Sequence, residues 1–240
     1  MTMSFKTELH CHCTAVSACG RITPTEIVEN YVKAGYTSLV ITDHISRDTF
    51  QSGNYLGAPD WDAKVDFFLR SYRALQEAAK GRLNILLGAE VRIDSHAAAD
   101  YLLYGVTEEF LRKAGCLHHF HLADLSRVAR ENGVLLVQAH PFRNYMVVTP
   151  PALLDGVEVF NASPTHAPIR CELAKLWAEH YGLIQTSGSD LHAPRPSQIA
   201  GGIETDEPIT SNEQLLEVLK SRNYRILQDT SNMKDDRLPQ

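Results

Sequence analysis

The chain has 240 residues, of which 44% are hydrophobic and 22% are charged. This composition is typical of a globular chain that is long enough to bury a substantial core in one domain. The formal net charge is -6, from 23 basic and 29 acidic residues, and no long basic run occurs. The charge therefore argues against nucleic acid as an obligatory partner.

Residues 1–6 lack the apolar core of a signal peptide, and no stretch reaches the ~20 apolar residues of a membrane-spanning helix. The sequence thus predicts a cytoplasmic protein with no membrane partner. The chain has five cysteines, an odd number, and no secretion signal, which argues against a disulfide framework. We expect reduced thiols.

The first half of the chain alternates strand-like apolar runs with helix-like segments. Thr23 suits the N-cap of a helix, Pro24 suits its first turn, and Glu26 completes a capping box. The pattern predicts strands at residues 5–12, 38–42, 85–91 and 101–106, and helices at residues 23–35 and 62–80.

The second half repeats this alternation, with Gly133 and Gly182 closing two of its helices. Seven strand-plus-helix units are countable, and no linker divides them, so we expect one domain over residues 1–228 and a polar tail over 229–240. Polar residues lie at the ends of nearly all the predicted strands and not at one switch point. This distribution favours a closed or partly closed β/α barrel over an open sheet. The pattern predicts helices at residues 122–132, 169–181 and 212–221, and strands at 134–139, 157–160 and 183–186.

His10 and His12 lie two residues apart in a predicted strand. Side chains alternate between the faces of a strand, so both imidazoles project from one face, close enough to bind one cation. Active sites of parallel α/β folds lie at the C-terminal ends of the strands, where this chain carries further polar groups. Those groups are Asp43, His44, Glu90, His140, Asp190 and His192.

Five short motifs resemble, in order and spacing, the signature of the PHP superfamily, the polymerase and histidinol phosphatase domain. The resemblance extends over nearly the whole chain. It implies a distorted (β/α)7 barrel with two or three divalent metal ions at the C-terminal ends of the strands, and phosphoesterase activity. The motifs are His10-x-His12, Thr42-Asp43-His44, Gly88-x-Glu90, His140-Pro141 and Ser189-Asp190-x-His192.

The resemblance also implies a role for each ligand. His10 and His12 would hold one metal together with Asp190. Glu90 would bridge two metals, and His140 would hold the second. The remaining pair, His44 and His192, would hold a third metal or complete the second. Imidazole with carboxylate suits Zn²⁺, Fe²⁺ or Mn²⁺, and such a site activates a bound water.

Three residues have expected catalytic roles. Glu90 would bridge the metals, His192 could protonate the departing oxygen, and Asp43 would orient a ligand imidazole. The nucleophile would be an activated water and not a side chain.

Two departures from the fullest family pattern leave the metal count open between two and three. Many members carry a His or Asp soon after the histidine pair, where this chain offers only Cys19. Many also carry a His after the fourth strand, where this chain has none over residues 103–109. Glu108 or His96 are the candidate substitutes.

Substrate recognition requires positive groups beside the metals. Arg143 and Arg195 each lie three residues beyond a predicted ligand, and a guanidinium can form two hydrogen bonds to one phosphate. Arg21 is a weaker third candidate, and Asn161 ends a predicted strand, where it could bind substrate. We therefore expect a small phosphorylated substrate, with histidinol phosphate, sugar phosphates and nucleotides all open.

Other interpretations remain at this point. Cys11 and Cys13 project opposite to the histidine pair and are expected to be small buried hydrophobes, while solvent exposure accounts for the histidines at 118, 119 and 121. An amidohydrolase-type barrel enzyme and a non-catalytic, regulatory PHP domain are alternatives to the phosphoesterase, and a nuclease is a weaker one. The oligomeric state is open.

Overall fold

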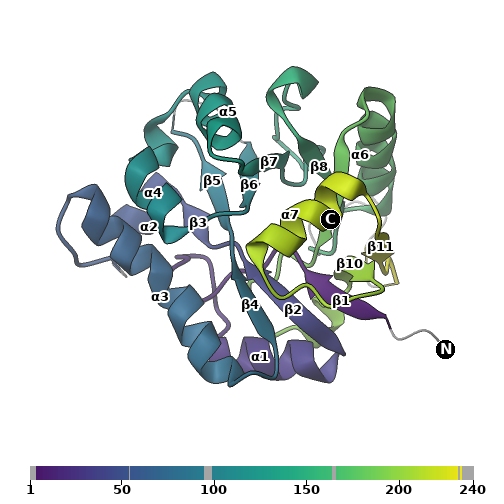
Figure 1. Cartoon of the computed structure of the whole chain (residues 1–240), viewed down its shortest axis with the longest axis horizontal. Coiled ribbons are helices and arrows are strands. Elements are labelled where there is room, and N and C mark those ends of the chain that lie inside the picture. Colours follow the sequence, from purple (N-terminus) through teal and green to yellow (C-terminus); the bar gives the residue numbers. More distant parts are fainter. Residues whose placement is uncertain (1–3, 54, 95–98, 164–165, 232, 234–240) are drawn as a thin grey trace.

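The computed structural model describes residues 4–53, 55–94, 99–163, 166–231 and 233. Its helices lie outside the strands, and α7 crosses in front of them in the view of Figure 1. The strands are β1(Phe5–Glu8), β2(Tyr36–Ile41), β3(His44–Ile45), β4(Asn84–Leu87), β5(Ala89–Arg92), β6(Asp100–Tyr104), β7(Leu135–Gln138), β8(Gly156–Asn161), β9(Ile184–Gly188), β10(Gly201–Thr205) and β11(Arg225–Gln228). The α-helices are α1(Pro24–Lys33), α2(Arg47–Gln51), α3(Trp61–Ala79), α4(Glu108–Ala114), α5(Leu122–Glu131), α6(Pro168–Tyr181) and α7(Asn212–Ser221).

The strands form two sheets, with the orders β11-β10-β1-β2-β4 and β3-β5-β6-β7-β8-β9. Pairing is parallel along β1-β2-β4, between β3 and β5, and along β7-β8-β9. It is antiparallel along β5-β6-β7 and along β1-β10-β11. The α/β class is therefore as expected, but the regular parallel pattern of seven units is only partly present, and barrel closure stays a prediction.

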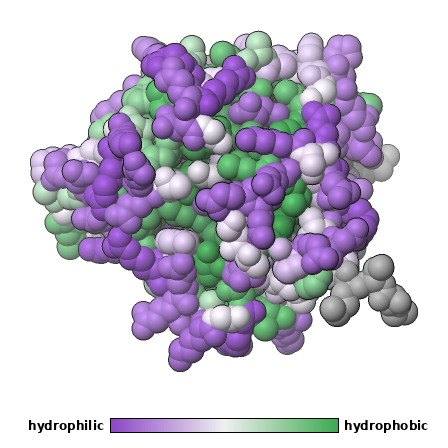
Figure 2. Space-filling model, viewed as in Figure 1, coloured by the Kyte–Doolittle hydropathy of each residue, from purple (hydrophilic) through white to green (hydrophobic). Residues whose placement is uncertain are grey.

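The predicted helices agree well with the structure. Thr23 caps α1, and both hydrogen bonds of the capping box with Glu26 are present. The last helix, α7, spans the predicted residues. Helices α1 and α3 place apolar faces on the sheets, with side chains such as Ile27, Phe68 and Leu75 buried in the core. Figure 2 shows hydrophilic side chains gathered over the outside of the molecule, with apolar surface between them.

The predicted strand over residues 85–91 is wrong in one respect, because Gly88 divides it. A Cβ at Gly88 would lie 2.7 Å from Val40 Cγ1, so only glycine allows the chain to pass this close to β2. The chain then leaves one sheet as β4 and enters the other as β5. As a result Glu90 pairs in register with His44 of β3.

The first strand is shorter than predicted. Glu8 accepts hydrogen bonds from the backbone N–H groups of Leu9 and His10, at 3.0 and 2.8 Å, which removes these donors from the sheet. An isolated parallel bridge between Cys11 and Leu191 continues the extended path. Cys11 and Cys13 are fully buried, as expected.

Strands β10 and β11 were not expected from the sequence. Among the described residues, no helix is long and apolar enough to cross a membrane. The expected cytoplasmic location and the division into residues 1–228 and a tail stay predictions.

Candidate functional site

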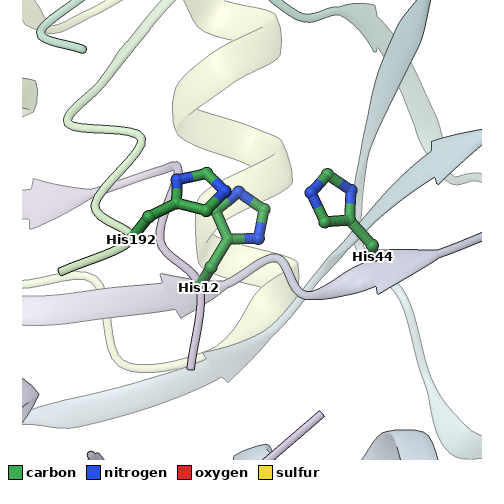
Figure 3. Close-up of side chains that lie close together, drawn as sticks. All are labelled: His12, His44 and His192. Atoms are coloured by element: carbon green, nitrogen blue, oxygen red, sulfur yellow. The ribbon is translucent and has the colours of Figure 1, made fainter. Parts of the chain in front are cut away.

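Seven predicted ligands meet at the ends of the strands. His10 and His12 follow β1, His140 follows β7, and Asp190 and His192 follow β9. The other two lie on short strands, His44 on β3 and Glu90 on β5. Figure 3 shows the side chains of His12, His44 and His192 lying close together. We call these seven residues the central cluster.

The histidine pair faces two carboxylates. His10 Nε2 lies 3.1 Å from His12 Nε2. Both nitrogens lie 3.3–3.4 Å from Asp190 Oδ1 and from Glu90 Oε2. Two imidazole nitrogens that face each other so closely would repel through their lone pairs unless a proton or a cation lies between them. His10, His12 and Asp190 thus form a first group around one point.

Glu90 connects this first group to a second. Its other oxygen, Oε1, lies 3.3 Å from His140 Nε2. Asp100 Oδ2 is 3.9 Å from the same His140 nitrogen, although Arg92 also holds this carboxylate through two hydrogen bonds of 2.6 and 2.7 Å. Glu90 therefore lies between two groups of donors, as a bridging carboxylate does.

A third group consists of His12, His44 and His192. The ring centroid of His12 lies 4.5 Å from the ring centroid of His44 and 4.1 Å from that of His192. His44 Nδ1 lies 3.0 Å from Glu90 Oε2, so the third group also adjoins this carboxylate.

Buried atoms without hydrogen bonds support a metal site. Glu90 Oε1 and His44 Nδ1 are buried, and neither has a hydrogen-bond partner among the described residues. Leaving such an atom unsatisfied costs ~1–3 kcal/mol, which a bound cation would offset. Imidazole and carboxylate donors suit Zn²⁺, Fe²⁺ and Mn²⁺ alike. The residues therefore fit divalent metal ions, without indicating which.

The electrostatics of the central cluster follow from burial and opposite charges. Burial alone would lower the pKa of His10, but Glu158, Asp190 and Glu90 outweigh it and raise that pKa well above its usual value. Burial together with the nearby His192 and His44 lowers the pKa of His12 well below its usual value. The imidazoles therefore differ in charge before any metal binds.

The carboxylates of the two acidic residues in the central cluster stay ionised. Burial opposes this, but His44 and His10 hold the pKa of Glu90 well below its usual value. Similarly, His10 and His192 hold the pKa of Asp190 well below its usual value against the effect of burial. Ionised carboxylates are the form that binds a metal.

Glu158 is a site residue that the sequence reasoning missed. Its Oε1 lies 2.8 Å from His10 Nδ1, and its Oε2 accepts hydrogen bonds from His140 N at 3.0 Å and Asn161 Nδ2 at 2.8 Å. A carboxylate behind a ligand imidazole fixes the orientation of the ring. The available signal was a charged residue inside the apolar run between Val157 and Val159.

Glu8 was missed as well. Its Oε1 accepts hydrogen bonds from Ser189 N and His10 N, and its Oε2 accepts one from Tyr31 Oη. Burial raises the pKa of Glu8. This carboxylate ties the segment of the histidine pair to the segment that carries Asp190.

Two of the predicted ligands have strained backbones. His140 has φ of 29° and Asp190 has φ of 49°, in a region that side chains other than glycine rarely adopt. Such strain persists only where the surrounding structure enforces it, and it concentrates at functional sites. Here the hydrogen bonds from His140 N to Glu158 and from Asp190 N to His10 O hold both turns.

Asp43 acts through a neighbour. Its Oδ1 accepts hydrogen bonds from Cys13 N at 2.9 Å and from Ser17 Oγ at 2.5 Å. Ser17 Oγ in turn accepts from His44 N at 3.1 Å and lies 3.5 Å from His12 Nδ1. Asp43 thus supports the segments that carry two ligands, and its catalytic role stays a prediction.

The predicted substrate residues lie in different positions. Arg143 Nη1 and Asn161 Nδ2 both contact Asp190 Oδ2, at 3.2 and 3.3 Å. Asn161 is fully buried and also bonds to Glu158 and Ser163, so its contact with a substrate stays a prediction. Arg195 is exposed beside the central cluster.

A cavity of about 330 Å³ opens next to the central cluster. It brings the predicted substrate residues Arg143 and Arg195 together with Arg21, the weaker candidate. Its lining includes Cys19, Arg21, Arg143, Asp190, His192 and Arg195.

The candidates for the missing metal ligands lie in different parts of the structure. Burial alone would raise the pKa of Cys19, but hydrogen bonds with His192 and His44 lower it to about 6, so this thiol adjoins the third group. Glu108 instead lies on the exposed face of α4, where Arg112 holds its carboxylate at 2.7 Å. His96 lies outside the described residues.

The expected exposure of His118 is wrong. His119 and His121 are exposed, but His118 is buried against Phe50, with ring centroids 5.3 Å apart. His118 and His119 form a separate group with Asp94, which we call the peripheral cluster.

Three solved structures show where this fold recurs. A two-domain protein from Bacteroides vulgatus ATCC 8482, described as containing a predicted PHP-like metal-dependent phosphoesterase, matches with a TM-score of 0.66 and 18% identity over 92% of this chain. An amidohydrolase from Chromobacterium violaceum, with bound sulfate and no metal, matches at 0.58 and 18% over 93% of this chain and 98% of its own. The lesion-specific endonuclease PfuEndoQ from Pyrococcus furiosus matches at 0.59 and 16% over 93% of this chain and 58% of its own.

These likenesses establish the fold and not the activity, because the identities are low and the three proteins differ in function. This chain spans 64% of the length of the Bacteroides protein. None of the curated protein sequences matches it. The model of the PHP domain, however, matches residues 8–226, which include every residue of the central cluster. The chain belongs to the PHP domain family.

Proposed function

We propose that this protein is a metal-dependent hydrolase of small phosphomonoesters. One observation carries the proposal: Glu90 lies between two groups of metal-binding donors, beside a cavity lined by arginines. Two divalent ions held by these donors would supply the positive charge that an in-line displacement at a phosphate requires.

Divalent ions held here would activate a water and offset the charge on the phosphate oxygens. Other side chains of the protein hold the predicted metal ligands in position. Glu158 fixes the ring of His10 through Nδ1. Arg143 and Asn161 hold Asp190 Oδ2, so the other oxygen, Oδ1, stays directed at the histidine pair.

His192 has one ring nitrogen to spare. Its Nδ1 donates to the backbone carbonyl oxygen of Asp190 at 3.0 Å, which leaves Nε2 for either a metal or a proton. In the metal-free protein, burial opposes the charged ring, but the Asp190 carboxylate outweighs it and raises the pKa of His192 to about 11. We infer that with two metals Nε2 delivers the proton to the departing oxygen, and that with three it is a ligand.

Arg143, beside the central cluster, favours a phosphate over an amide. A planar guanidinium group can donate two hydrogen bonds to two oxygens of a phosphate or carboxylate, whereas an uncharged amide does not require a cation. The bound sulfate of the Chromobacterium protein has the shape and charge of a phosphate, which agrees with this preference. Amide hydrolysis is therefore the second candidate, supported by the likeness to that amidohydrolase.

The test is hydrolysis by purified protein that has been reconstituted separately with Mn²⁺, Zn²⁺ and Fe²⁺. We expect release of inorganic phosphate from p-nitrophenyl phosphate and from at least one member of a panel of histidinol, sugar and nucleoside phosphates. A panel of amides and phosphodiesters is run in parallel. Folded, metal-loaded protein that cleaves only members of the second panel would overturn the proposal.

A further inference from the structure

The cavity beside the central cluster carries more positive charge than one phosphate requires. Arg21, Arg143 and Arg195 line it, whereas Asp190 and the Cys19 thiol supply the acidic groups among the described lining residues. This carboxylate is shared already, because Arg143 Nη1 lies 3.2 Å from Asp190 Oδ2 and the histidine pair faces Oδ1. The arginines therefore outnumber the acidic groups of the lining, and Arg21 and Arg195 exceed what one phosphate requires.

Arg21 and Arg195 have no charge partner in the part of the chain that the structure describes. Neither side chain forms an ion pair or a hydrogen bond there, in contrast to Arg143. Their backbones are nevertheless held: Arg21 N donates to His192 O at 2.6 Å, and Arg195 N to Ala193 O at 2.6 Å. Both exposed side chains thus start from anchored segments on the cavity wall.

Charge balance assigns these two arginines to a group other than the scissile phosphate. A phosphate at the central cluster would be balanced by the divalent ions and by Arg143. Two further guanidinium groups on the cavity wall would then remain without an anion. An anion elsewhere on the substrate would pair with them.

We propose that the substrate carries a second anionic group, a carboxylate or a phosphate, on its leaving group, and that Arg21 and Arg195 bind it. This inference rests on the proposed function. The cavity volume of about 330 Å³ favours a compact molecule, with the two anions separated by a few bonds. Arginine forks recognise either anion through paired hydrogen bonds.

The first test compares three-carbon substrates that differ in their second group. Glycerol 3-phosphate is neutral there, 3-phosphoglycerate carries a carboxylate, and propane-1,3-diyl bisphosphate carries a phosphate. We expect kcat/KM to be about 10- to 100-fold higher for an anionic substrate than for the neutral one, because charge-assisted hydrogen bonds are made only with the anion. The ratio between the two anionic substrates distinguishes a carboxylate from a phosphate site.

Substitutions of the two arginines test whether they cause the preference for an anionic substrate. In Arg21→Gln and Arg195→Gln, the preference for the anionic substrate should fall toward one. Arg127→Gln is the matched control, since Arg127 is an exposed arginine of α5 that pairs with Glu131. It should keep the full preference.

A binding measurement checks the inference without turnover. Propylphosphonate and 3-phosphonopropionate have the same length, and their C–P bonds resist hydrolysis. Calorimetry on metal-loaded protein should give a dissociation constant at least ~10-fold lower for 3-phosphonopropionate, and Arg195→Gln should remove the difference.

The outcomes separate the two proposals. Equal kcat/KM for all three substrates, or an unchanged preference in both arginine variants, overturns the second-anion inference and leaves the phosphatase standing. Failure to hydrolyse any phosphomonoester, including p-nitrophenyl phosphate, overturns the proposed function itself.

Discussion

The central and peripheral clusters contain the same residue types in different surroundings. In the central cluster, the carboxylates of Glu90 and Asp190 are buried and face imidazole nitrogens at 3.0–3.4 Å. In the peripheral cluster, Arg47 lies 3.2 Å from the Asp94 carboxylate, and His119 Nε2 lies 3.6 Å from it. A cation would have to compete with Arg47 for the peripheral carboxylate.

The difference lies in the residues behind the ligands. Glu158 and Ser17 orient the rings of the central cluster, and Glu8 joins the segments that carry them. His118 has no such support in the part of the chain that the structure describes, where its buried Nδ1 lacks a hydrogen-bond partner. A concentration of histidines is therefore insufficient, and buried carboxylates in two layers distinguish the candidate metal site.

The largest effect is expected at Glu90. Glu90→Gln keeps the shape of the side chain but removes the charge between the donor groups, so kcat/KM should fall by about 10³-fold or more. Phosphate release and metal content by elemental analysis measure this. Glu109→Gln is the control, since Glu109 is an exposed glutamate of α4. Activity within tenfold of the parent would contradict the bridging role.

Glu158→Gln tests the supporting layer. The amide can still contact His10 Nδ1 but carries no charge, so metal affinity or activity should drop by roughly 10- to 100-fold. A positioning role predicts partial recovery of activity at high metal concentration, which a collapsed fold would not show. Unchanged metal affinity would remove Glu158 from the site.

His118 should make stability depend on pH. Burial and the neighbouring His119 lower the pKa of His118 to about 4, below the ~6.5 of an unfolded chain. The unfolded state thus takes up the proton first, and His118's share of stability, present above about pH 6.5, is lost as the pH falls to 4.

In metal-free protein, His118→Phe should therefore reduce the fall in unfolding free energy between pH 6.5 and 4 by roughly 1–3 kcal/mol. Urea titrations across this range measure it. His121→Gln, an exposed neighbour, should leave the pH dependence unchanged. Parallel pH profiles for the parent and His118→Phe would show that folding does not change the pKa of His118.

The smallest effect is expected at His119. His119→Ala should change activity by less than ~2-fold and the unfolding free energy by less than ~0.5 kcal/mol, since the residue is exposed and apart from the central cluster. Elemental analysis should give the same metal content as the parent. Loss of one metal equivalent would show that the peripheral cluster also binds a metal.

Much of the fold and of the candidate site could be predicted from local patterns in the sequence. The capping box at Thr23 and the helix over residues 212–221 depend on neighbours a few positions away, and both are present. The spacing of His10 and His12 likewise indicated that their rings share one side, and His10 Nε2 and His12 Nε2 do meet.

Only the tertiary structure decided the long-range features. Gly88 divides a strand because of contact with Val40, 48 positions away, and Glu158 acts on His10 across 148 positions. Likewise, the burial of His118 depends on packing against Phe50 of α2. A sequence pattern records which groups alternate along the chain, but packing and hydrogen bonds between distant segments determine which of them meet.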